Sequence, residues 1–205
     1  MDVSKLKDIQ LDALKEVANI GACHAATALS ELTGEKVMVN VPVIRINPIE
    51  EVFSLVAKPN EVVASVLIYF LGDMTGRTLL LFPQEAAWHL TDCLMRQPLG
   101  TTKKFGELEE SALKELSNVL TCAYMNSLGD LLGLVVVPSV PSMAVDMASA
   151  VLETVSLEFS SDKDMVVCIE TEFRFVEKNT TLYGYFLLLP DPASLEVILK
   201  AIHLG

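Results

Sequence analysis

The sequence lacks the long apolar runs and the basic regions that membrane proteins and nucleic-acid-binding proteins need. Its most apolar stretches, residues 62–71 and 78–82, reach at most about half the length of a membrane-spanning helix. The net charge of −12 argues against non-specific binding to nucleic acid or to an anionic membrane surface. Together with the short apolar stretches, it leads us to expect neither nucleic-acid binding nor membrane insertion. The first residues hold no apolar run behind a basic start, which predicts a cytoplasmic protein without a signal peptide. A partner that presents lysine or arginine remains compatible with this acidic chain.

Cysteine is scarce, and the four cysteines stand far apart in the sequence. They form no Cys-x-x-Cys pair and no cluster with histidine, so no zinc site is predicted. His24, His89 and His203 are isolated on predicted helices, and we interpret them as packed or partly exposed rather than catalytic. Residues 129–133 begin and end with glycine but lack the Lys-Ser/Thr of a phosphate-binding loop. The sequence therefore predicts that the chain binds no metal or cofactor of its own.

What the sequence does contain is a repeat. An aspartate or serine is followed four residues later by a glutamate, and three residues after that by an asparagine. The pattern occurs twice, 99 residues apart, as Asp12, Glu16 and Asn19 and then as Ser111, Glu115 and Asn118. At about 3.6 residues per turn, the three side chains of each copy lie on one stripe of a helix. Repetition at a fixed offset predicts a duplicated unit with a function.

The same offset pairs Gly34 with Gly133 and Pro42 with Pro141. Each glycine stands where a long helix is expected to end, as glycine often does. Pro42 lies in a predicted strand, where proline favours a sheet edge or a bulge, and Pro141 directly follows the corresponding predicted strand. We interpret these four residues as structural parts of the repeat.

The predicted secondary structure also repeats. In the first half we expect a helix over 5–33, a strand over 35–46, a short helix or turn over 48–56, strands over 62–71 and 76–82, and a helix over 84–95. In the second half we expect a helix over 107–132, a strand over 134–140, a short helix over 142–155, strands over 165–175 and 180–189, and a helix over 191–204. Later in the chain, corresponding segments of the two halves lie 107 residues apart instead of 99. An insertion of eight residues between 155 and 165 would explain this difference.

These elements predict the fold class α/β (α+β), with residues 1–205 forming a single domain. Its two repeats would be residues 1–96 and 107–205, joined by a linker at 97–106. The pseudo-two-fold duplicated domain would share one mixed or antiparallel sheet between helical layers.

The repeated stripe suits chemistry on a phosphoryl group. Glutamate is an anion that can hold a lysine, and asparagine can hold a water molecule because its carboxamide both donates and accepts hydrogen bonds. Hydrolysis of a phosphoryl group depends mostly on positioning, and a carboxamide can orient the attacking water. A solvated helix face would also contain exposed glutamate and asparagine, and it is the repetition that favours a functional interpretation.

The motif resembles the signature of the CheC/CheX/FliY family of phosphatases, which dephosphorylate the chemotaxis response regulator CheY. The signature is Asp/Ser-x-x-x-Glu-x-x-Asn followed after 22 residues by proline, and it fits from Asp12 to Pro42 and from Ser111 to Pro141. The CheC branch fits best, because a CheX-like chain would be shorter with one copy and a FliY-like chain would carry extra domains. A FliM-like switch domain would lack the motif.

The resemblance implies a role for each matched residue. Glu16 and Glu115 would each grip the active-site lysine of CheY, and Asn19 and Asn118 would each orient water for attack on the aspartyl phosphate. Asp12 and Ser111 would be peripheral, and their difference means that the two sites need not be equally active. The Mg²⁺ ion would belong to CheY.

The resemblance also implies a second partner, the receptor deamidase CheD. The alternative function is therefore a non-catalytic adaptor that binds phosphorylated CheY and regulates CheD. Asp146 stands among small residues in the predicted helix over 142–155, as deamidation sites on chemoreceptor helices do. We expect Asp146 to contact CheD, although a surface helix with a solvated aspartate explains the same sequence.

Overall fold

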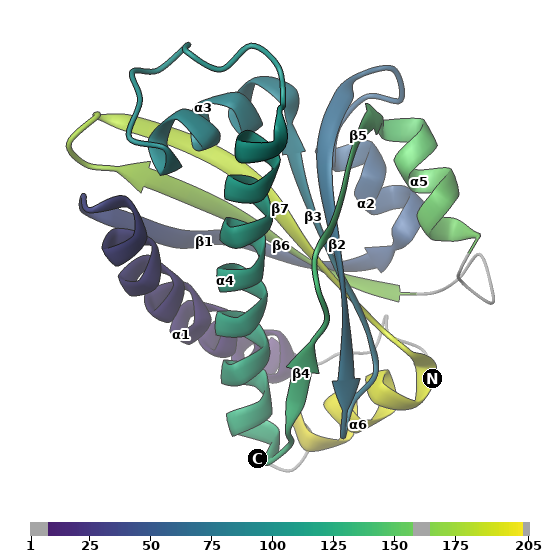
Figure 1. Cartoon of the computed structure of the whole chain (residues 1–205). Helices are drawn as coiled ribbons and strands as arrows, with labels where there is room; N and C mark the ends of the chain where they lie inside the picture. Colours follow the sequence, from purple (N-terminus) through teal and green to yellow (C-terminus); the bar gives the residue numbers. More distant parts are fainter. Residues whose placement is uncertain (1–7, 158–164, 203–205) are drawn as a thin grey trace.

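The computed structural model describes residues 8–157 and 165–202. Within them a seven-stranded sheet lies between helices (Figure 1). The helices are α1 (Asp8–Thr33), α2 (Ile49–Val56), α3 (Gln84–Leu94), α4 (Glu107–Leu132), α5 (Ala148–Ser156) and α6 (Pro192–Ile202). The strands are β1 (Val37–Pro48), β2 (Val62–Gly72), β3 (Gly76–Pro83), β4 (Val136–Pro138), β5 (Ser142–Met147), β6 (Met165–Phe175) and β7 (Thr180–Pro190).

All strand pairs in the sheet are antiparallel, in the order β1-β6-β7-β3-β2-β4, with β5 also paired to β2. The predicted duplicated α/β fold is confirmed, and of the two sheet types allowed by the prediction the antiparallel one is present. The two hairpins, β2–β3 and β6–β7, meet at the centre through β3 and β7. The outer strand of each half pairs with the hairpin of the other half, so the sheet joins the halves. The division at residues 97–106 remains a prediction.

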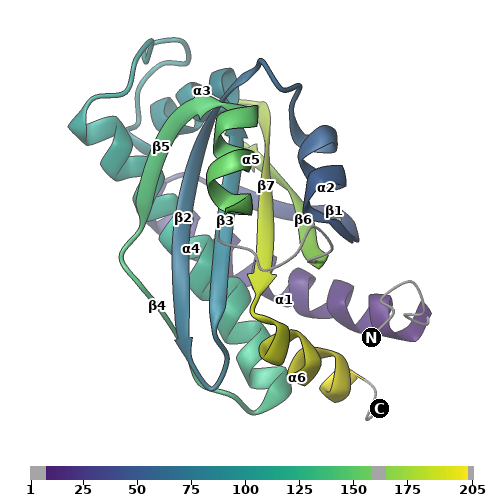
Figure 2. The same cartoon turned by 90° about the vertical axis from the view of Figure 1, so that its right-hand side faces the viewer.

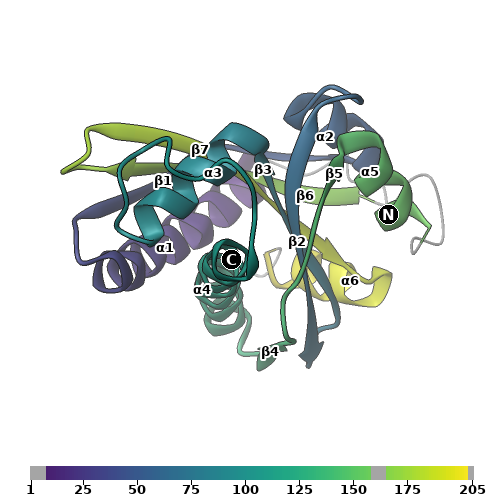
Figure 3. The ribbon, with the colours of Figure 1, turned by 45° about the horizontal axis from the view of Figure 1, so that its top comes forward.

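Two apolar cores lie on the two faces of the sheet. On one face the buried side chains of α1, α3 and α4 pack against the strands, together with the phenylalanines of β2, β3, β6 and β7. On the other face α2 and α5 cover a smaller core. Figures 2 and 3 show the two short helices on the opposite side of the sheet from α1 and α4. Each long helix therefore turns one face to the core and leaves the other accessible.

The two long helices cross closely because α1 has a glycine at the crossing point. A Cβ atom on Gly21 would lie 2.5 Å from Cδ1 of Tyr124 on α4. The ring of Tyr124 in turn packs on Phe186, with 4.8 Å between the ring centroids. This packing fixes the position of α4, and with it the second copy of the repeated stripe.

The repeated glycines and prolines have the predicted structural roles. Gly34 and Gly133 have φ angles of 70° and 67°, the left-handed conformation that ends a helix. The pairing of β1 with β6 shifts register between Asn40 and Val43, around Pro42. On the opposite edge of the sheet, β4 and β5 both pair with β2, and this pairing is interrupted between them, around Pro141. Because proline lacks an N–H group, each outer strand is interrupted at this residue.

One predicted element is wrong. The stretch 142–155 was expected to be a single helix, but its first part is strand β5, which pairs with β2 from Leu67↔Ser142 to Val62↔Met147. The helix, α5, begins only at Ala148. β5 mixes small, apolar and acidic residues without a periodic pattern of its own, so pairing with the apolar strand β2 decides its conformation. The preceding strand is also shorter than predicted, since β4 covers only Val136–Pro138.

The other predicted elements agree with the structure to within a few residues, and α4 and β6 have the predicted bounds. The predicted ends of the first and last helices, at 5–7 and 203–204, lie outside the described residues. So does most of the proposed insertion before residue 165.

The connection between the halves is held by one buried carboxylate. Asp92 on α3 accepts hydrogen bonds from the backbone N–H groups of Gly100 (2.7 Å), Thr101 (3.2 Å) and Thr102 (2.8 Å). Burial by itself would raise the pKa of Asp92, but the contacts with Thr102, Gly100 and Thr101 lower it below the ordinary value. The predicted linker is therefore an ordered loop that is anchored to α3.

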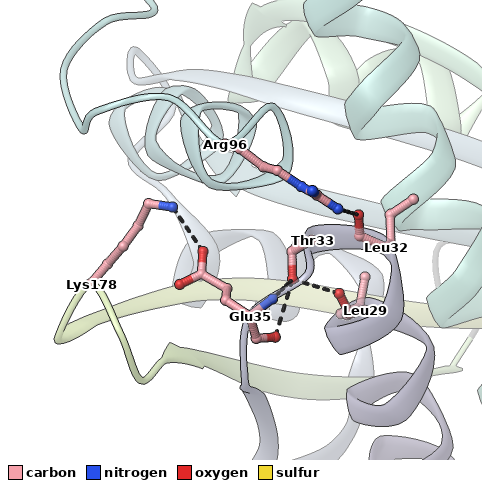
Figure 4. A network of polar contacts seen from close by, with 6 residues as sticks. All are labelled: Leu29, Leu32, Thr33, Glu35, Arg96 and Lys178. Carbon is pink, nitrogen blue, oxygen red and sulfur yellow. Dashed lines mark hydrogen bonds and ion pairs between the residues drawn. The ribbon is translucent and has the colours of Figure 1, made fainter.

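A second polar network fixes the end of α1 (Figure 4). Lys178, in the β6–β7 turn, donates to the buried carboxylate of Glu35 at 2.8 Å. Arg96, which follows α3, donates to the carbonyl of Leu32 at 3.3 Å, and Thr33 donates to the carbonyl of Leu29 at 2.8 Å. The hydrogen bond to Glu35 raises the pKa of Lys178. The network ties α1 to the sheet and to α3.

Candidate functional site

Both copies of the repeated stripe lie on the accessible faces of the long helices. On α1, Asp12, Glu16 and Asn19 are exposed, while Leu14 and Val17 between them are buried. This is the amphipathic arrangement that the 3.6-residue period predicts. The structure thus presents the three polar side chains of the first copy to solvent.

The second copy has the same arrangement on α4. Ser111 and Glu115 are exposed, Asn118 is partly exposed, and Leu113 and Leu116 are fully buried in the main core. The helix is preceded by its N-cap residue Gly106, whose N–H group donates to the Glu109 carboxylate at 2.9 Å. The stripe therefore lies along the first half of a well-anchored helix.

Beside the second copy the surface is hollowed, with a volume of about 390 Å³. One wall is α4, and the other is the connection from β4 to β5, which runs alongside α4 in Figures 1 and 3. The residues lining the hollow are Ser111, Lys114, Glu115, Asn118, Pro138, Ser139, Val140 and Pro141. The hollow thus contains every polar residue predicted for the second site, and also the repeated proline.

Sequence reasoning missed Ser139 and Val140 as parts of this wall. The sequence contains a pattern that could have identified Val140. The dipeptide Val-Pro repeats at the same offset of 99 as the rest of the motif, at Val41-Pro42 and Val140-Pro141.

The carboxamide of Asn118 has a neighbour that sequence reasoning also missed. The Cys122 thiol, one turn further along α4, donates a weak hydrogen bond to Oδ1 of Asn118 at 3.9 Å. Burial and, to a smaller extent, the charge of Glu115 raise the pKa of Cys122, so the sulfur carries a proton at neutral pH. Cys23 likewise stands four residues after Asn19. This repetition in the sequence could have identified the cysteine as part of the motif.

The lysines beside the two glutamates pair with other carboxylates. Lys114 contacts Glu110 at 3.4 Å, and Lys15 contacts Asp12 at 3.3 Å. Both are exposed ion pairs of the kind that contributes little to stability. They leave the Glu115 carboxylate at the hollow as a site for an incoming cation.

Among residues 8–157 and 165–202, the structure shows no cluster of three or more histidine, cysteine, aspartate or glutamate side chains able to hold a metal ion. Nor does the described part of the chain hold a helix long and apolar enough to cross a membrane.

Asp146, the predicted CheD contact, lies apart from the repeated stripes. It is exposed near the end of β5, and its carboxylate accepts a hydrogen bond from the Met147 N–H group at 2.7 Å. It lines a second hollow of about 170 Å³, between β5 and α5, with small neighbours such as Ser142, Ala144 and Ala150. Larger apolar side chains, among them Leu67, Leu79 and Val151, line the same hollow. Asp146 itself lies on a strand rather than on the predicted helix.

Comparison with known proteins finds relatives along the whole chain. The model of the CheC-like family matches residues 9–46, which include the first motif and its proline. The CheY-P phosphatase CheC of Bacillus subtilis is 31% identical over 199 residues, covering 96% of this chain and 95% of that protein.

Solved structures with a similar fold include a FliY and a FliM domain. Thermotoga maritima FliY superposes with a TM-score of 0.78 at 20% identity, covering 97% of this chain and 98% of that chain. The FliM middle domain of H. pylori superposes with a TM-score of 0.67 at 13% identity, covering 96% and 99%. At these identities the likeness concerns the fold.

Proposed function

The chain belongs to the CheC family, and we propose that it is a phosphatase that hydrolyses the aspartyl phosphate of the response regulator CheY. The observation that carries this proposal is the hollow on α4, in which Glu115 and Asn118 stand side by side with open space in front of them. A partner can bring its own phosphoryl group into such a hollow.

The residues of the hollow suit a hydrolysis that depends on positioning. Asn118 accepts a hydrogen bond from a water molecule through Oδ1 and keeps its N–H groups free for a phosphoryl oxygen. The water oxygen attacks phosphorus, the bond between phosphorus and the aspartyl oxygen breaks, and one proton of the water is released to the solvent. The products are inorganic phosphate and the free carboxylate of CheY. No covalent intermediate on this chain is required.

Glu115 binds the partner through an ion pair. Its carboxylate lies one turn before Asn118 on the same face and binds the lysine that accompanies the aspartyl phosphate in CheY. A charge-assisted contact of this kind fixes the partner's orientation. The enzyme needs no cofactor of its own, because the Mg²⁺ ion at the phosphate belongs to CheY.

The first copy works in the same way, with Glu16 as the grip and Asn19 as the water-positioning group. Asp12 and Ser111 lie at the borders of their sites. Because Asp12 stands where the second copy has Ser111, the stripe of the first site carries an additional carboxylate, which pairs with Lys15.

The experiment is the loss of phosphate from labelled CheY with the wild type, each Asn→Ala variant, and the double variant Asn19→Ala/Asn118→Ala. Both side chains are outside the core, so the double variant is expected to fold normally and to lose at least about 10²-fold of the acceleration. An Asn126→Ala variant, changed at an exposed asparagine two turns further along α4, is the control and should keep its activity. A folded double variant with full activity would contradict the proposal.

We also propose that the protein acts in the cytoplasm and binds CheD through the surface around Asp146. The supporting observation is that an exposed carboxylate adjoins a hollow lined by a mixture of small and larger apolar side chains. The alternative function is an adaptor, in which binding of phosphorylated CheY regulates CheD and hydrolysis is secondary. The labelled-phosphate experiment separates the two, since an adaptor would bind phosphorylated CheY without accelerating its loss of phosphate.

A further inference from the structure

Val140 is 87% exposed, although it is a large apolar side chain. It lines the same hollow as Glu115 and Asn118. An isolated exposed valine is common on protein surfaces, and it needs an explanation here because of its position in the wall of the proposed active site.

The exposure of Val140 comes from an ordered backbone. Immediately before it, the Ser139 N–H group donates to the Tyr69 carbonyl at 2.8 Å, and the Tyr69 N–H group donates to the Ser139 hydroxyl at 3.1 Å. Two residues after it, Ser142 resumes pairing with β2, opposite Leu67. Val140 is therefore held at a defined position between two anchored residues.

Folding does not require a valine in this exposed position. In the first repeat the corresponding residue, Val41, is partly buried and packs against the main core. Val140 has no comparable burial, so its side chain contributes little to the stability of the chain. An apolar side chain that is ordered, exposed and beside a reaction site is suited to contact with a partner.

The apolar surface continues along β5. Val145 and Met147 are 39% and 46% exposed, and they lie opposite Ala64 and Val62 of β2. Ala64 belongs to the core that α1, α3 and α4 cover, so Val145 and Met147 face the same side of the sheet as α4. Val140, Val145 and Met147 thus form an apolar border on one side of the acidic α4 stripe, and we name them the apolar border.

We propose that the apolar border is a docking surface for the protein partner of the α4 site, with Val140 as the residue that determines partner specificity. The inference rests on the proposed function. A partner whose aspartyl phosphate reaches Asn118 must enter the hollow that Val140 lines, and so must cover this side chain. The matching partner surface presents a lysine to Glu115 and an apolar side chain to Val140.

The border explains how the enzyme selects a folded phosphoprotein. A small phosphorylated molecule could approach Asn118 without touching Val140, whereas a protein domain buries it. Removal of apolar contact area lowers affinity without changing the reacting groups. Replacement of Val140 should therefore raise KM and leave kcat nearly unchanged.

The test uses the Asn19→Ala background, in which the α4 site alone carries the proposed asparagine. Val140→Ser in this background is expected to raise KM for phosphorylated CheY about tenfold and to change kcat less than twofold. The matched control is Val137→Ser, on β4, which is 57% exposed but does not line the hollow, and its KM should equal that of the parent. Equal melting temperatures would show that both variants are folded.

A binding measurement keeps the inference separate from the proposed hydrolysis. CheY activated with beryllofluoride, which mimics the aspartyl phosphate, is titrated into the parent, Val140→Ser and Val137→Ser proteins, each of which also carries Glu16→Ala to remove the proposed lysine contact of the first site. About tenfold weaker binding of the Val140→Ser variant alone supports the docking surface, even if the Asn19→Ala parent proves inactive and the proposed function fails. Equal affinity of all three proteins overturns the docking surface, whatever their activity.

Discussion

The Cys122 thiol lies 3.9 Å from Oδ1 of Asn118, four residues earlier on α4. Positions four apart on a helix are neighbours on one face, so the contact is built into the sequence of the repeat. Since Cys122 stays protonated at neutral pH, the thiol acts as a donor and holds the carboxamide oxygen toward itself. The N–H groups of Asn118 are thereby directed away from the thiol.

The first prediction concerns this contact. In an Asn19→Ala background, Cys122→Ala should lower kcat for CheY dephosphorylation about two- to fivefold, because loss of one weak hydrogen bond costs about 0.5–1 kcal/mol. KM and the melting temperature should not change. Cys23→Ala in the same background is the control and should have no effect, because its asparagine is already absent. A Cys122→Ala enzyme with parental kcat would show that the thiol only fills space.

The second prediction concerns the glutamates. If Glu16 and Glu115 hold a lysine of CheY, phosphatase activity should fall as the ionic strength rises, since exposed charge contacts are screened by salt. The double variant Glu16→Ala/Glu115→Ala should be less active and should depend less steeply on salt. Glu153→Ala, changed at an exposed glutamate of α5, should keep the wild-type salt profile. If activity depended on salt in the same way in all three proteins, the proposed contact between the glutamates and a CheY lysine would be wrong.

The third prediction concerns the buried carboxylate of Asp92. Asp92→Asn should reduce the free energy of unfolding by about 2 kcal/mol at pH 7, because an NH₂ group would then face backbone N–H groups. The measurement is urea unfolding at several pH values. Asp130→Asn, at an exposed position of α4, is the control and should be nearly neutral.

The same carboxylate predicts a pH dependence. The pKa of Asp92 is lowered in the folded state, so the unfolded state binds its proton first as the pH falls. Its contribution is fully present above the unfolded pKa of about 3.9 and is lost as the pH falls through the lower folded pKa. The stability difference between the wild type and Asp92→Asn should be constant from pH 7 to about pH 5 and should shrink below about pH 4. A difference that grows in acid would contradict this assignment.

The fourth prediction concerns the ion pair between Lys178 and Glu35. Lys178→Met leaves the buried Glu35 carboxylate unpaired and should destabilise the fold by about 2 kcal/mol, less than for a fully buried pair because the lysine is partly exposed. The double variant Glu35→Leu/Lys178→Met should recover part of the loss. The pKa of Lys178 is raised, so the pair's contribution is present below the unfolded lysine pKa of about 10.4 and is lost as the pH rises through the folded value. The difference in the free energy of unfolding between the wild type and Lys178→Met should therefore be constant between pH 6 and 9.

The fifth prediction concerns Asp146. If CheD binds at the hollow between β5 and α5, Asp146→Lys should weaken CheD binding more than tenfold, because reversal of a charge inside an interface costs more than at its border. CheY dephosphorylation without CheD should stay near the wild-type level. Glu153→Lys supplies a matched charge reversal on the neighbouring helix α5. Unchanged CheD affinity of the Asp146→Lys variant would place the interface elsewhere.

The sequence by itself determined the long helices, the positions of the four strands that form the two central hairpins, and the polar stripes. The bounds of α4 were predicted because its apolar period, its acidic first turn and Gly133 all lie within one segment of the chain. The three polar positions of each repeat are likewise a property of local helix geometry. A pattern that depends on neighbours in the sequence can be recognised without the tertiary structure.

Only the tertiary structure decided the conformation of residues 142–147 and the hollow on α4. The strand β5 forms because β2, about 80 residues earlier in the chain, offers it a pairing edge. That pairing stops at Pro141, and the interruption places Val140 beside Asn118, which is 22 residues away in the sequence. The stripe could be recognised in the sequence because all of its residues lie on one helix. The opposite wall of the hollow depends on pairing between strands that are distant in the sequence, and local periodicity carries no information about such pairing.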